Sequence, residues 1–271
     1  MSRPPDDLPK KVQDKLKLAK DAYELSHRLG MEALDEIVQV SSTGGDSGQA
    51  APPAPNPHDK AYLKLGEGSR NATMLFMDIV GYSRLETDDD QREAIEGLNE
   101  VVRNALGEIR CDIDDLICLP TGDGMCLCFF SPEQALRAAE SIQQLIDAGT
   151  GQPIQLRMGL HCGSILRVND LKGAYNLAGD AINRTQRAMD CGDERHIICT
   201  EEAYKVFVRR RDFKASLTRL GEVEVKHGLK LDLYNYACKA RNIGNPERPQ
   251  KAKARPVSKG RPTRGLPKPS A

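Results

Sequence analysis

Apolar positions along the chain separate one structured region from the segments on either side of it. Between residues 70 and 238, apolar runs of strand length alternate with stretches of helical periodicity. Residues 41–58 are rich in Ser, Gly, Ala and Pro, and residues 239–271 are rich in Pro, Lys and Arg. Such segments bury too little apolar area to offset the entropy of ordering. The pattern predicts a globular domain between a flexible linker and a disordered basic tail.

The predicted elements of this domain follow one order along the chain. Strands are predicted at 72–80, 116–119, 125–130, 154–168 (a pair broken at Gly163), 197–199 and 220–237 (a hairpin turning at His227-Gly228). Helices are predicted at 90–109, 131–146, 179–189 and 201–208. This order is typical of an α+β fold, with a ferredoxin-like, antiparallel-rich sheet and helices on one face.

The N-terminal segment, residues 1–40, is predicted to form an amphipathic helix ahead of the linker. Apolar side chains recur at helical spacing in two stripes: Val12, Leu16, Ala19 and Tyr23, and Leu18, Ala22, Leu25 and Leu29. Gly30 interrupts the stripes, so a long coiled coil is not expected. The helix could add contacts between two copies of the chain or pack on its own domain.

Composition favours a soluble, cytoplasmic protein. The chain has 271 residues, of which 39% are hydrophobic and 4% aromatic, enough for one ordinary core. Its longest apolar run, Met125 to Phe130, is far too short to span a membrane, and the N-terminus lacks the apolar stretch of a signal peptide. None of the eight cysteines stands at zinc-ligand spacing, so we expect reduced, buried thiols.

Charge is distributed unevenly although the net charge is zero. Residues 239–271 contain ten Lys or Arg and one acidic residue, a net charge of +9, so the first 238 residues carry −9. A basic segment of this kind could contact nucleic acid or anionic lipid. It has neither aromatic residues for stacking on bases nor an amphipathic pattern for lipid insertion, so nucleic acid is not an expected partner.

Two aspartates stand where chemistry is expected. Asp78 lies at the end of an apolar strand, just before Gly81, and Asp123 lies in the glycine-flanked turn Thr121-Gly-Asp-Gly124. Carboxylates at neighbouring strand ends can hold divalent cations, and Gly81 would let the backbone approach a triphosphate. On spacing alone, two ordinary turn residues explain the pattern equally well.

Five segments in consistent order resemble class III adenylate and guanylate cyclases. Residues 76–83 (Phe-Met-Asp-Ile-Val-Gly-Tyr-Ser) and 121–124 (Thr-Gly-Asp-Gly) resemble the two metal motifs of that family. Residues 157–163 (Arg-Met-Gly-Leu-His-Cys-Gly) and 179–187 resemble the strand before the transition-state helix and that helix itself. Residues 225–234 resemble the closing hairpin. The resemblance covers about residues 72–238 and implies a cyclase catalytic domain at 70–238.

The resemblance implies a two-metal enzyme that converts a nucleoside triphosphate into a 3′,5′-cyclic monophosphate and pyrophosphate. Asp78, Asp123 and the backbone carbonyl of Ile79 would bind two Mn²⁺ or Mg²⁺ ions, and Gly81 and Tyr82 would lie against the substrate. The sequence does not distinguish Mn²⁺ from Mg²⁺, and it does not identify what activates the enzyme.

The same resemblance assigns the catalytic helix. Asn183 would orient the ribose and Arg187 would meet charge that develops on the α-phosphate; spaced four apart, they share one helix face. In the family these residues face the metal carboxylates across a dimer interface. The chain carries both halves, which implies a homodimer with two composite sites. Lys226 or Lys230 would anchor the triphosphate.

The residues expected to read the base depart from the family pattern. Adenylate cyclases use Lys and Asp or Thr, and guanylate cyclases use Glu and Cys, where this chain has Leu119 and Asn176. Three readings stay open. One is a pyrimidine substrate, UTP or CTP, as in bacterial antiphage cyclases with an antiviral signalling role. The others are an ATP or GTP cyclase with a different base pocket, and a catalytically silent regulatory domain.

Overall fold

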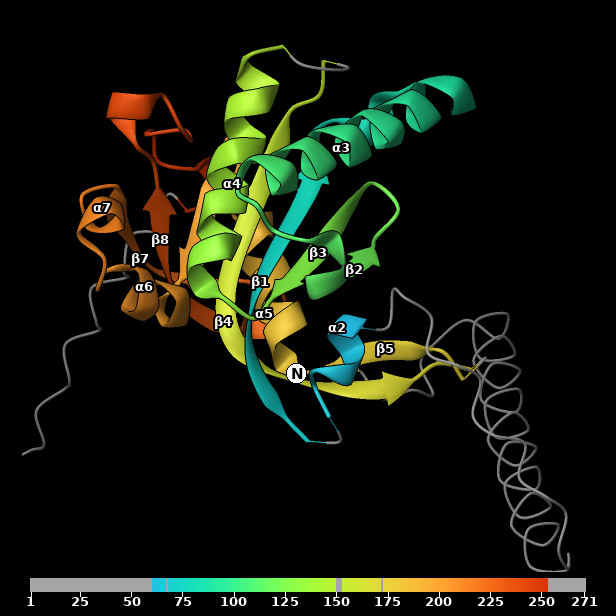
Figure 1. Ribbon diagram of the computed structural model, residues 1–271. Helices are drawn as coiled ribbons and strands as arrows, with labels where there is room; N and C mark the ends of the chain where they lie inside the picture. The colour runs from blue at the N-terminus through green and yellow to red at the C-terminus, as the bar shows by residue number, and fades with distance from the viewer. Residues whose placement is uncertain (1–59, 67, 150–152, 172, 253–271) are drawn as a thin grey trace, which may run out of the picture. The chain divides into compact units, whose positions relative to one another are not determined.

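The computed structural model describes residues 60–66, 68–149, 153–171 and 173–252, which belong to one compact unit (Figure 1). The predicted N-terminal helix 1–40, the linker 41–58 and the last part of the predicted tail, residues 253–271, lie outside the described residues. Among the described residues, no helix combines the length and the apolar character that crossing a membrane requires.

A mixed sheet forms the centre of the domain. Its strands lie in the order β2-β3-β1-β4-β6-β8-β7, with β5 paired to β4; β4 and β6 are parallel and the other pairs antiparallel. The strands are β1 Arg70–Ile79, β2 Ile117–Pro120, β3 Gly124–Phe129, β4 Leu156–Asn169, β5 Tyr175–Ala178, β6 Ile197–Thr200, β7 Leu217–Glu224 and β8 Lys230–Tyr236. The predicted α+β class and antiparallel-rich sheet are confirmed.

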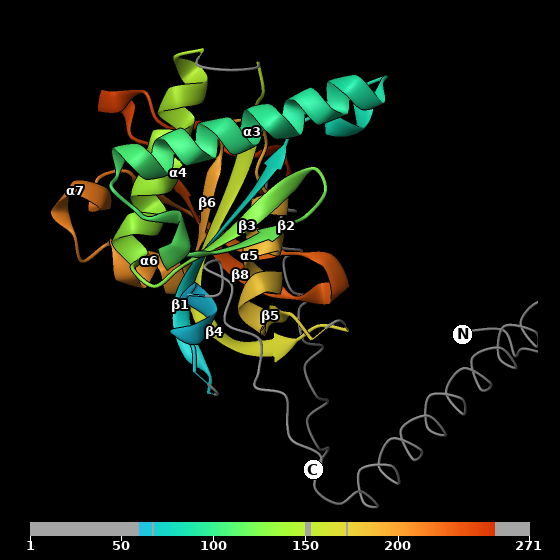
Figure 2. The same ribbon diagram turned by 45° about the vertical axis from the view of Figure 1, so that its right-hand side comes forward.

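Helices cover both faces of this sheet. The helices are α2 Lys60–Leu63, α3 Asp88–Glu108, α4 Pro132–Asp147, α5 Asp180–Asp190, α6 Glu201–Phe207 and α7 Arg211–Lys214. As Figures 1 and 2 show, α3, α4 and α6 lie on one face, and α5 lies on the other. The predicted layer on one face is therefore present, and α5 adds a second layer.

Strand β1 explains why both faces are covered. Its last eight residues are all buried, and alternate side chains point to opposite faces. Leu75 and Met77 join the core under α3 and α4, whereas Met74 and Phe76 join a second cluster with Ala181 of α5. A strand with apolar residues at every position requires packing on both sides.

One helix cap and the closing hairpin follow the sequence prediction. The Ser131 hydroxyl accepts a hydrogen bond from the Gln134 backbone N–H, with Pro132 as first helical residue. The β7–β8 hairpin turns through residues 226–228, where Gly228 has φ +72°. These local signals place the element boundaries because each depends on only a few neighbouring residues.

The predicted break at Gly163 is wrong. Strand β4 runs unbroken for 14 residues through Gly163, and the chain reverses later, between Asn169 and Tyr175, to form β5. Glycine at 163 is needed for space, since a Cβ there would lie 2.5 Å from Nε2 of His161 and 3.0 Å from Cβ of Ala181. A glycine that makes room for neighbours looks the same in sequence as one that turns the chain.

The folded domain also extends beyond its predicted end at residue 238. Ile243 is buried in the main core and Ala252 in the cluster that includes Ile198 and Leu233. Residues 239–252 are therefore part of the folded domain rather than of a disordered tail. Their apolar side chains are widely spaced between Pro and basic residues, so the sequence shows no apolar pattern that would predict this packing.

Candidate active site

The two predicted aspartates meet at one end of β1. Asp78 is the penultimate residue of β1, and its register places it opposite Gly124 of β3 and Arg157 of β4. Asp123 occupies the tip between β2 and β3, where its backbone carbonyl accepts a hydrogen bond of 3.0 Å from the Ile79 N–H. The hairpin tip is thus tied to the strand end that carries Asp78.

Gly124 lets this hairpin approach β1. A Cβ at Gly124 would overlap the carbonyl oxygen of Met77 and lie 2.9 Å from Cα of Asp78. A side chain there would push the hairpin, and with it Asp123, away from Asp78. The glycine of the Gly-Asp-Gly turn is therefore required by the closeness of two strands.

Asp78 is buried and held by an arginine. Its side chain is about nine-tenths buried, and Nε and Nη2 of Arg157 donate hydrogen bonds of 2.8 and 2.5 Å to its Oδ2. Burial raises the pKa of Asp78 to about 6; Arg157 opposes this rise and the neighbouring Asp123 adds to it. Two acidic residues, Asp78 and Asp123, therefore lie close together beside the Arg157 guanidinium.

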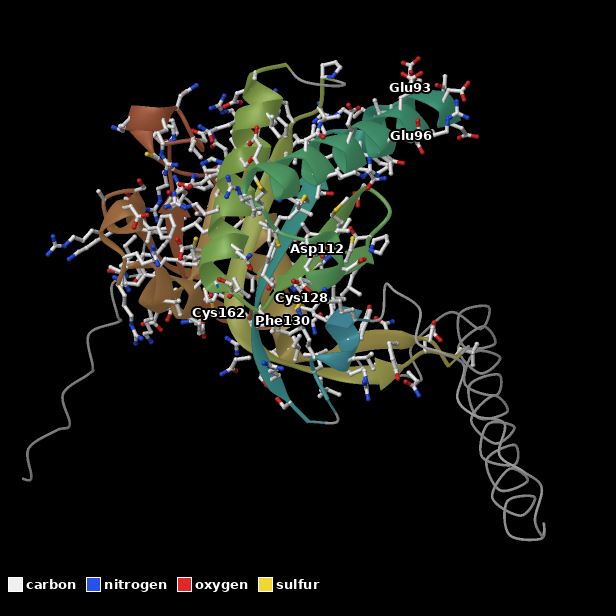
Figure 3. All side chains as sticks on the ribbon, in the orientation of Figure 1. Glu93, Glu96, Asp112, Cys128, Phe130 and Cys162 are labelled. Carbon is white, nitrogen blue, oxygen red and sulfur yellow. The ribbon has the colours of Figure 1, made fainter. Side chains whose placement is uncertain are left out.

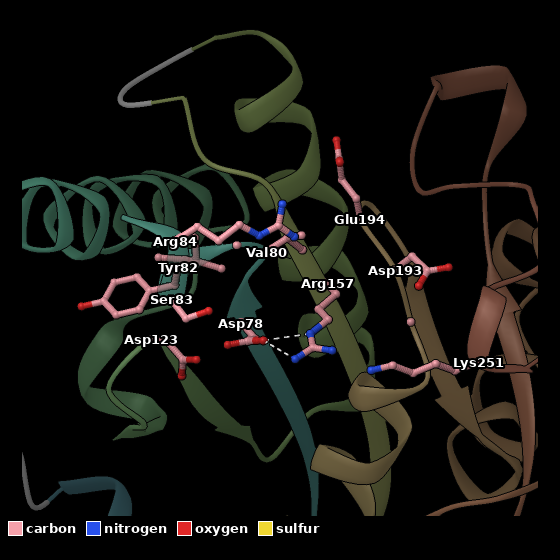
Figure 4. Close-up of a pocket in the computed structure, with 13 residues that line it drawn as sticks. Asp78, Val80, Tyr82, Ser83, Arg84, Asp123, Arg157, Asp193, Glu194 and Lys251 are labelled. Atoms are coloured by element: carbon pink, nitrogen blue, oxygen red, sulfur yellow. Dashed lines mark hydrogen bonds and ion pairs between the residues drawn. The ribbon is translucent and has the colours of Figure 1, made fainter. Parts of the chain in front are cut away.

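A cavity of about 440 Å³ opens in front of these residues (Figure 4). Its walls include Asp78, Asp123, Arg157 and the loop of residues 79–84. Gly81 in this loop has φ +83°, a conformation that favours glycine, and starts the 3₁₀ helix Tyr82–Arg84. The first N–H groups of such a turn have no partner within it, so they are available to an anion.

The carboxylate pair fits divalent cations. Among the described residues, no group of three or more His, Cys, Asp or Glu side chains gathers as a metal site. Mg²⁺ and Mn²⁺ need few protein ligands when phosphate oxygens and water complete the shell. Asp78 and Asp123 supply hard oxygen donors, and a cation bound there would offset the burial and the neighbouring Asp123 that raise the pKa of Asp78.

Beside the cavity, several cationic side chains converge on Asp190 at the end of α5. Its carboxylate lies 3.7 Å from Arg157, 3.7 Å from Arg187 and 3.9 Å from Lys226. Lys226 is thus near the predicted site, whereas Lys230 pairs with Glu222 at 2.9 Å on the outer hairpin. Of the two lysine candidates, only Lys226 reaches this cluster.

The predicted base-reading residues do not line the cavity. Leu119 is half-buried and packs with the cluster under α5, which includes Ile182 of that helix. Asn176 is exposed on β5, and its Oδ1 accepts a hydrogen bond of 2.8 Å from the Leu177 N–H. Asn183 is exposed on α5. The predicted metal residues and the predicted base and ribose residues thus occupy different parts of one chain.

Arg157, Asp190 and Lys251 are neighbours of this site that sequence reasoning did not identify. Arg157 lies in one of the five segments that resemble the cyclase family. Its pairing with Asp78, 79 positions away in the sequence, depends on the register of β1 against β4. Asp190 follows Arg187 by three residues, a spacing that allows contact on a helix. Lys251 gives no sequence signal within its own segment.

Burial raises the pKa of seven of the eight cysteines, whereas for Cys238 burial is outweighed by hydrogen bonds with Arg241 and Ser216, which lower its pKa. All eight are free thiols, and burial raises the pKa of Cys128 to about 12 and that of Cys162 to about 11. Figure 3 shows both near Phe130. Their partners on β1 are Met74 and Thr73, which precede Asp78 on that strand by four and five residues. Thiols with such raised pKa values are poor nucleophiles at neutral pH. The expectation of reduced thiols that are mostly buried agrees with this arrangement, although Cys118 is exposed.

Comparison with known proteins finds similarity to nucleotide cyclases over part of the chain. Residues 125–240 match the family described as the adenylate and guanylate cyclase catalytic domain. The chain is 32% identical over 102 residues to the human guanylate cyclase soluble subunit beta-2, and 27% identical over 157 residues to the human alpha-2 subunit. These matches cover 37% and 53% of this chain but only 16% and 21% of the two relatives.

Solved structures share the fold. The guanylate cyclase domain of RhGC from Catenaria anguillulae, solved in complex with GTP, has a TM-score of 0.53 at 20% identity. That comparison covers 63% of this chain and 98% of the other. An adenylate/guanylate cyclase/hydrolase from Silicibacter pomeroyi has a TM-score of 0.50 at 24% identity, with 64% and 99% covered. At these identities the likeness concerns the fold.

Proposed function

We propose that the chain converts a nucleoside triphosphate into a 3′,5′-cyclic monophosphate and pyrophosphate, a proposal that the match of residues 125–240 to the adenylate and guanylate cyclase catalytic domain supports. The observation that carries this proposal is the meeting of Asp78, Asp123 and Arg157 in one cavity, beside a glycine loop. Two carboxylates for cations, a cation for phosphate and free backbone N–H groups are the components that phosphoryl chemistry needs.

In the proposed reaction the ribose 3′-oxygen attacks the α-phosphorus, and the bond from that phosphorus to the bridging oxygen of pyrophosphate breaks. Bound at Asp78 and Asp123, with the Ile79 carbonyl, two divalent cations would activate the hydroxyl and neutralise the leaving group. Gly81 and Tyr82 would lie along the triphosphate. Arg187 would stabilise charge on the α-phosphate, a task that suits a planar, permanently charged guanidinium.

We further propose that the working unit is a homodimer with composite sites. Asn183 and Asn176 are exposed and do not line the cavity that contains Asp78 and Asp123. In a twofold dimer, one chain can offer its carboxylates while its partner offers Asn183 and Arg187. The position of Arg187 beside Asp190 in the same chain supports the competing arrangement, a site within one chain.

For the base we propose a pyrimidine, UTP or CTP, which would give a signalling role of the antiviral kind. Oδ1 of Asn176 accepts a hydrogen bond from the N–H of the next residue, Leu177, so the amide N–H groups of Asn176 remain as donors. Donors fit the carbonyl oxygen of uracil and the O2 and N3 acceptors of cytosine. Leu119 has an apolar side chain, so it cannot make the hydrogen bond by which a lysine at this position recognises adenine.

The alternative substrate is GTP. One observation favours it over ATP: the relatives reported above are named as guanylate cyclase subunits. The Asn176 donors would fit the O6 acceptor of guanine, and they would equally fit the ring-nitrogen acceptors of adenine. Substitution of Asn176 by Asp keeps the shape of the side chain and removes its donors. The variant should therefore raise KM for the natural substrate, whichever base it carries.

The test is a substrate panel. Purified full-length chain is incubated with Mn²⁺ and each of ATP, GTP, CTP and UTP separately, and cyclic products are quantified by mass spectrometry. A cyclic pyrimidine as main product would support the base assignment, and cyclic GMP would support the alternative. No product from any of the four, from folded protein, would contradict the enzyme proposal and favour a silent regulatory domain.

A further inference from the structure

The chain between residues 242 and 252, the C-terminal strap, crosses the end of α5 beyond the segment matched by the cyclase family. It is anchored by backbone hydrogen bonds: Asn245 N–H to the Arg195 carbonyl at 2.9 Å, and Gln250 N–H to Oδ2 of Asp193 at 2.7 Å. The Glu247 carbonyl lies 2.9 Å from Nε2 of His196. These bonds fix the course of the strap on the domain.

The strap brings Lys251 to the cavity. Lys251 is one of the residues that line it, together with Asp78 and Arg157, and Figure 4 shows its side chain extending toward Arg157. Its neighbour Ala252 is 1% exposed, which holds the backbone at this point. Nζ of Lys251 donates a hydrogen bond of 2.8 Å to the Asp190 carbonyl. An ammonium group has three donors, so two remain.

Cationic side chains gather at this edge of the cavity, whose wall also holds the acidic residues Asp193 and Glu194. Arg157, Arg187 and Lys226 surround one carboxylate, that of Asp190, and Lys251 adds a fourth cation through the Asp190 carbonyl. The Asp78 carboxylate pairs with Arg157 and offsets part of this charge. When cations occupy Asp78 and Asp123, Arg157 and Lys251 are left to attract an anion.

We propose that Lys251 binds the pyrophosphate part of the substrate, from the same chain as Asp78 and next to Arg157. The identity of the anion rests on the proposed function. The strap would then be an added wall of the site, and Lys251 a substrate-binding residue that lies outside the family's own segment. A lysine contact strengthens phosphate binding by a charge-assisted hydrogen bond.

The experiment measures binding without turnover. Inorganic pyrophosphate in excess Mn²⁺ is titrated into the full-length chain by calorimetry, using wild type, Lys251→Ala, Lys251→Arg and Lys214→Ala. Lys214 is an exposed lysine of α7 and serves as the matched control. We expect Lys251→Ala to bind about tenfold more weakly, Lys251→Arg to stay near wild type, and Lys214→Ala to match wild type. Equal melting temperatures confirm folding.

Two results would overturn the inference: binding by Lys251→Ala within twofold of wild type, or an equal loss in Lys214→Ala. The result is separable from the proposed function. Cyclic product without any Lys251 effect on pyrophosphate binding would sink the inference and leave the cyclase. Conversely, if pyrophosphate binding depends on Lys251 but the chain cyclises no nucleotide, the inference stands and the proposed cyclase function fails. In an active enzyme, Lys251→Ala should raise KM more than it lowers kcat.

Discussion

Single residues decide whether the two carboxylates of the cavity meet. Gly124 leaves no room for a Cβ between the β2–β3 hairpin and β1, because that atom would overlap the Met77 carbonyl. Gly107, near the end of α3, has no atom within 4 Å of a Cβ built on it. Packing therefore requires glycine at position 124, whereas position 107 has room for a side chain.

Gly124→Ala should lower the free energy of unfolding by about 2 kcal/mol, the usual cost of overpacking. It should also weaken Mn²⁺ binding, since the hairpin that carries Asp123 must shift. Gly107→Ala should leave metal binding unchanged and stabilise the chain by up to about 1 kcal/mol through helix propensity. Urea denaturation and Mn²⁺ titration measure both effects. A Gly124→Ala variant as stable as wild type would contradict the packing argument.

His161, on β4 next to Cys162, makes the stability of the fold depend on pH. It is 3% exposed, its Nδ1 lies 2.9 Å from Oγ1 of Thr200, and burial lowers its pKa, with Arg184 also lowering it and Glu202 opposing. The unfolded chain therefore takes up this proton at higher pH than the folded chain. Stability contributed by neutral His161 is complete above about pH 6.5 and falls as pH drops toward the folded pKa.

We expect the stability advantage of wild type over His161→Gln to shrink between pH 7.5 and pH 5.5. Chemical denaturation of both chains at each pH measures it, and other titrating groups cancel in the difference. An advantage that stays constant or grows toward acid would mean that His161 does not titrate in this way.

At this scale the sequence predicts what local position determines. Asp78 at a strand end and Asp123 in a glycine turn are readable because each depends on a few neighbours. The pairing of Asp78 with Arg157 is not readable, since it follows from the register of β1 against β4. Likewise, the sequence does not predict that the Leu177 N–H donates a hydrogen bond to Oδ1 of Asn176, which leaves the amide N–H groups of Asn176 as its donors.

Secondary-structure elements are joined at one place by a buried charge network. Glu140 of α4 is 2% exposed and accepts hydrogen bonds from Tyr236 at the end of β8, from Arg137 and from Arg241. Arg241 immediately precedes the C-terminal strap. The network thus fastens α4 to the segment from which the strap departs.

Glu140→Ala should lower the free energy of unfolding by about 3 kcal/mol, because removal of one member leaves buried polar partners uncompensated. Glu133→Ala is the control: this partly exposed residue of the same helix pairs with Arg210 at 2.7 Å, and its loss should cost about 0.5 kcal/mol. Urea denaturation compares the two. Equal losses in both variants would show that the network adds nothing beyond a surface pair.

Element prediction succeeded where periodicity and capping agree and failed where tertiary contacts decide. Helix α4 begins where Ser131 and Pro132 predict it. The sequence predicted a break in β4 at Gly163, but glycine is needed there to leave room for His161 and Ala181. The sequence did not predict β5. Four residues of β5 are too few to give a periodic signal of their own.

Whole-molecule organisation raises the question of how many chains build one site. The homodimer proposal predicts that two inactive variants restore activity when mixed, one altered in the metal half and one in the helix. With Asp123→Ala and Arg187→Ala, half of the reassorted dimers contain one intact site, so activity should reach about a quarter of the wild-type value. Product formation after co-refolding or prolonged mixing measures it. Failure to complement, with exchange of chains verified, would favour a site within one chain.

The extent of the domain was the part of the molecular organisation that the sequence hid. Residues 239–252 look like the start of a Pro- and Lys-rich tail, and they fold because Ile243 and Ala252 each find a buried position. Single apolar residues of this kind carry no pattern. The core of the domain, by contrast, followed from its repeated apolar runs.

The central claim is that Asp78 and Asp123 support nucleotide cyclisation, and one measurement tests it most directly. Cyclic nucleotide and pyrophosphate are quantified together from the preferred triphosphate in Mn²⁺, for wild type, Asp123→Asn and Glu93→Gln, a control far out on α3 (Figure 3). The account predicts equimolar products from wild type and Glu93→Gln, and a loss of at least about a hundredfold in Asp123→Asn. Undiminished product from Asp123→Asn would contradict it.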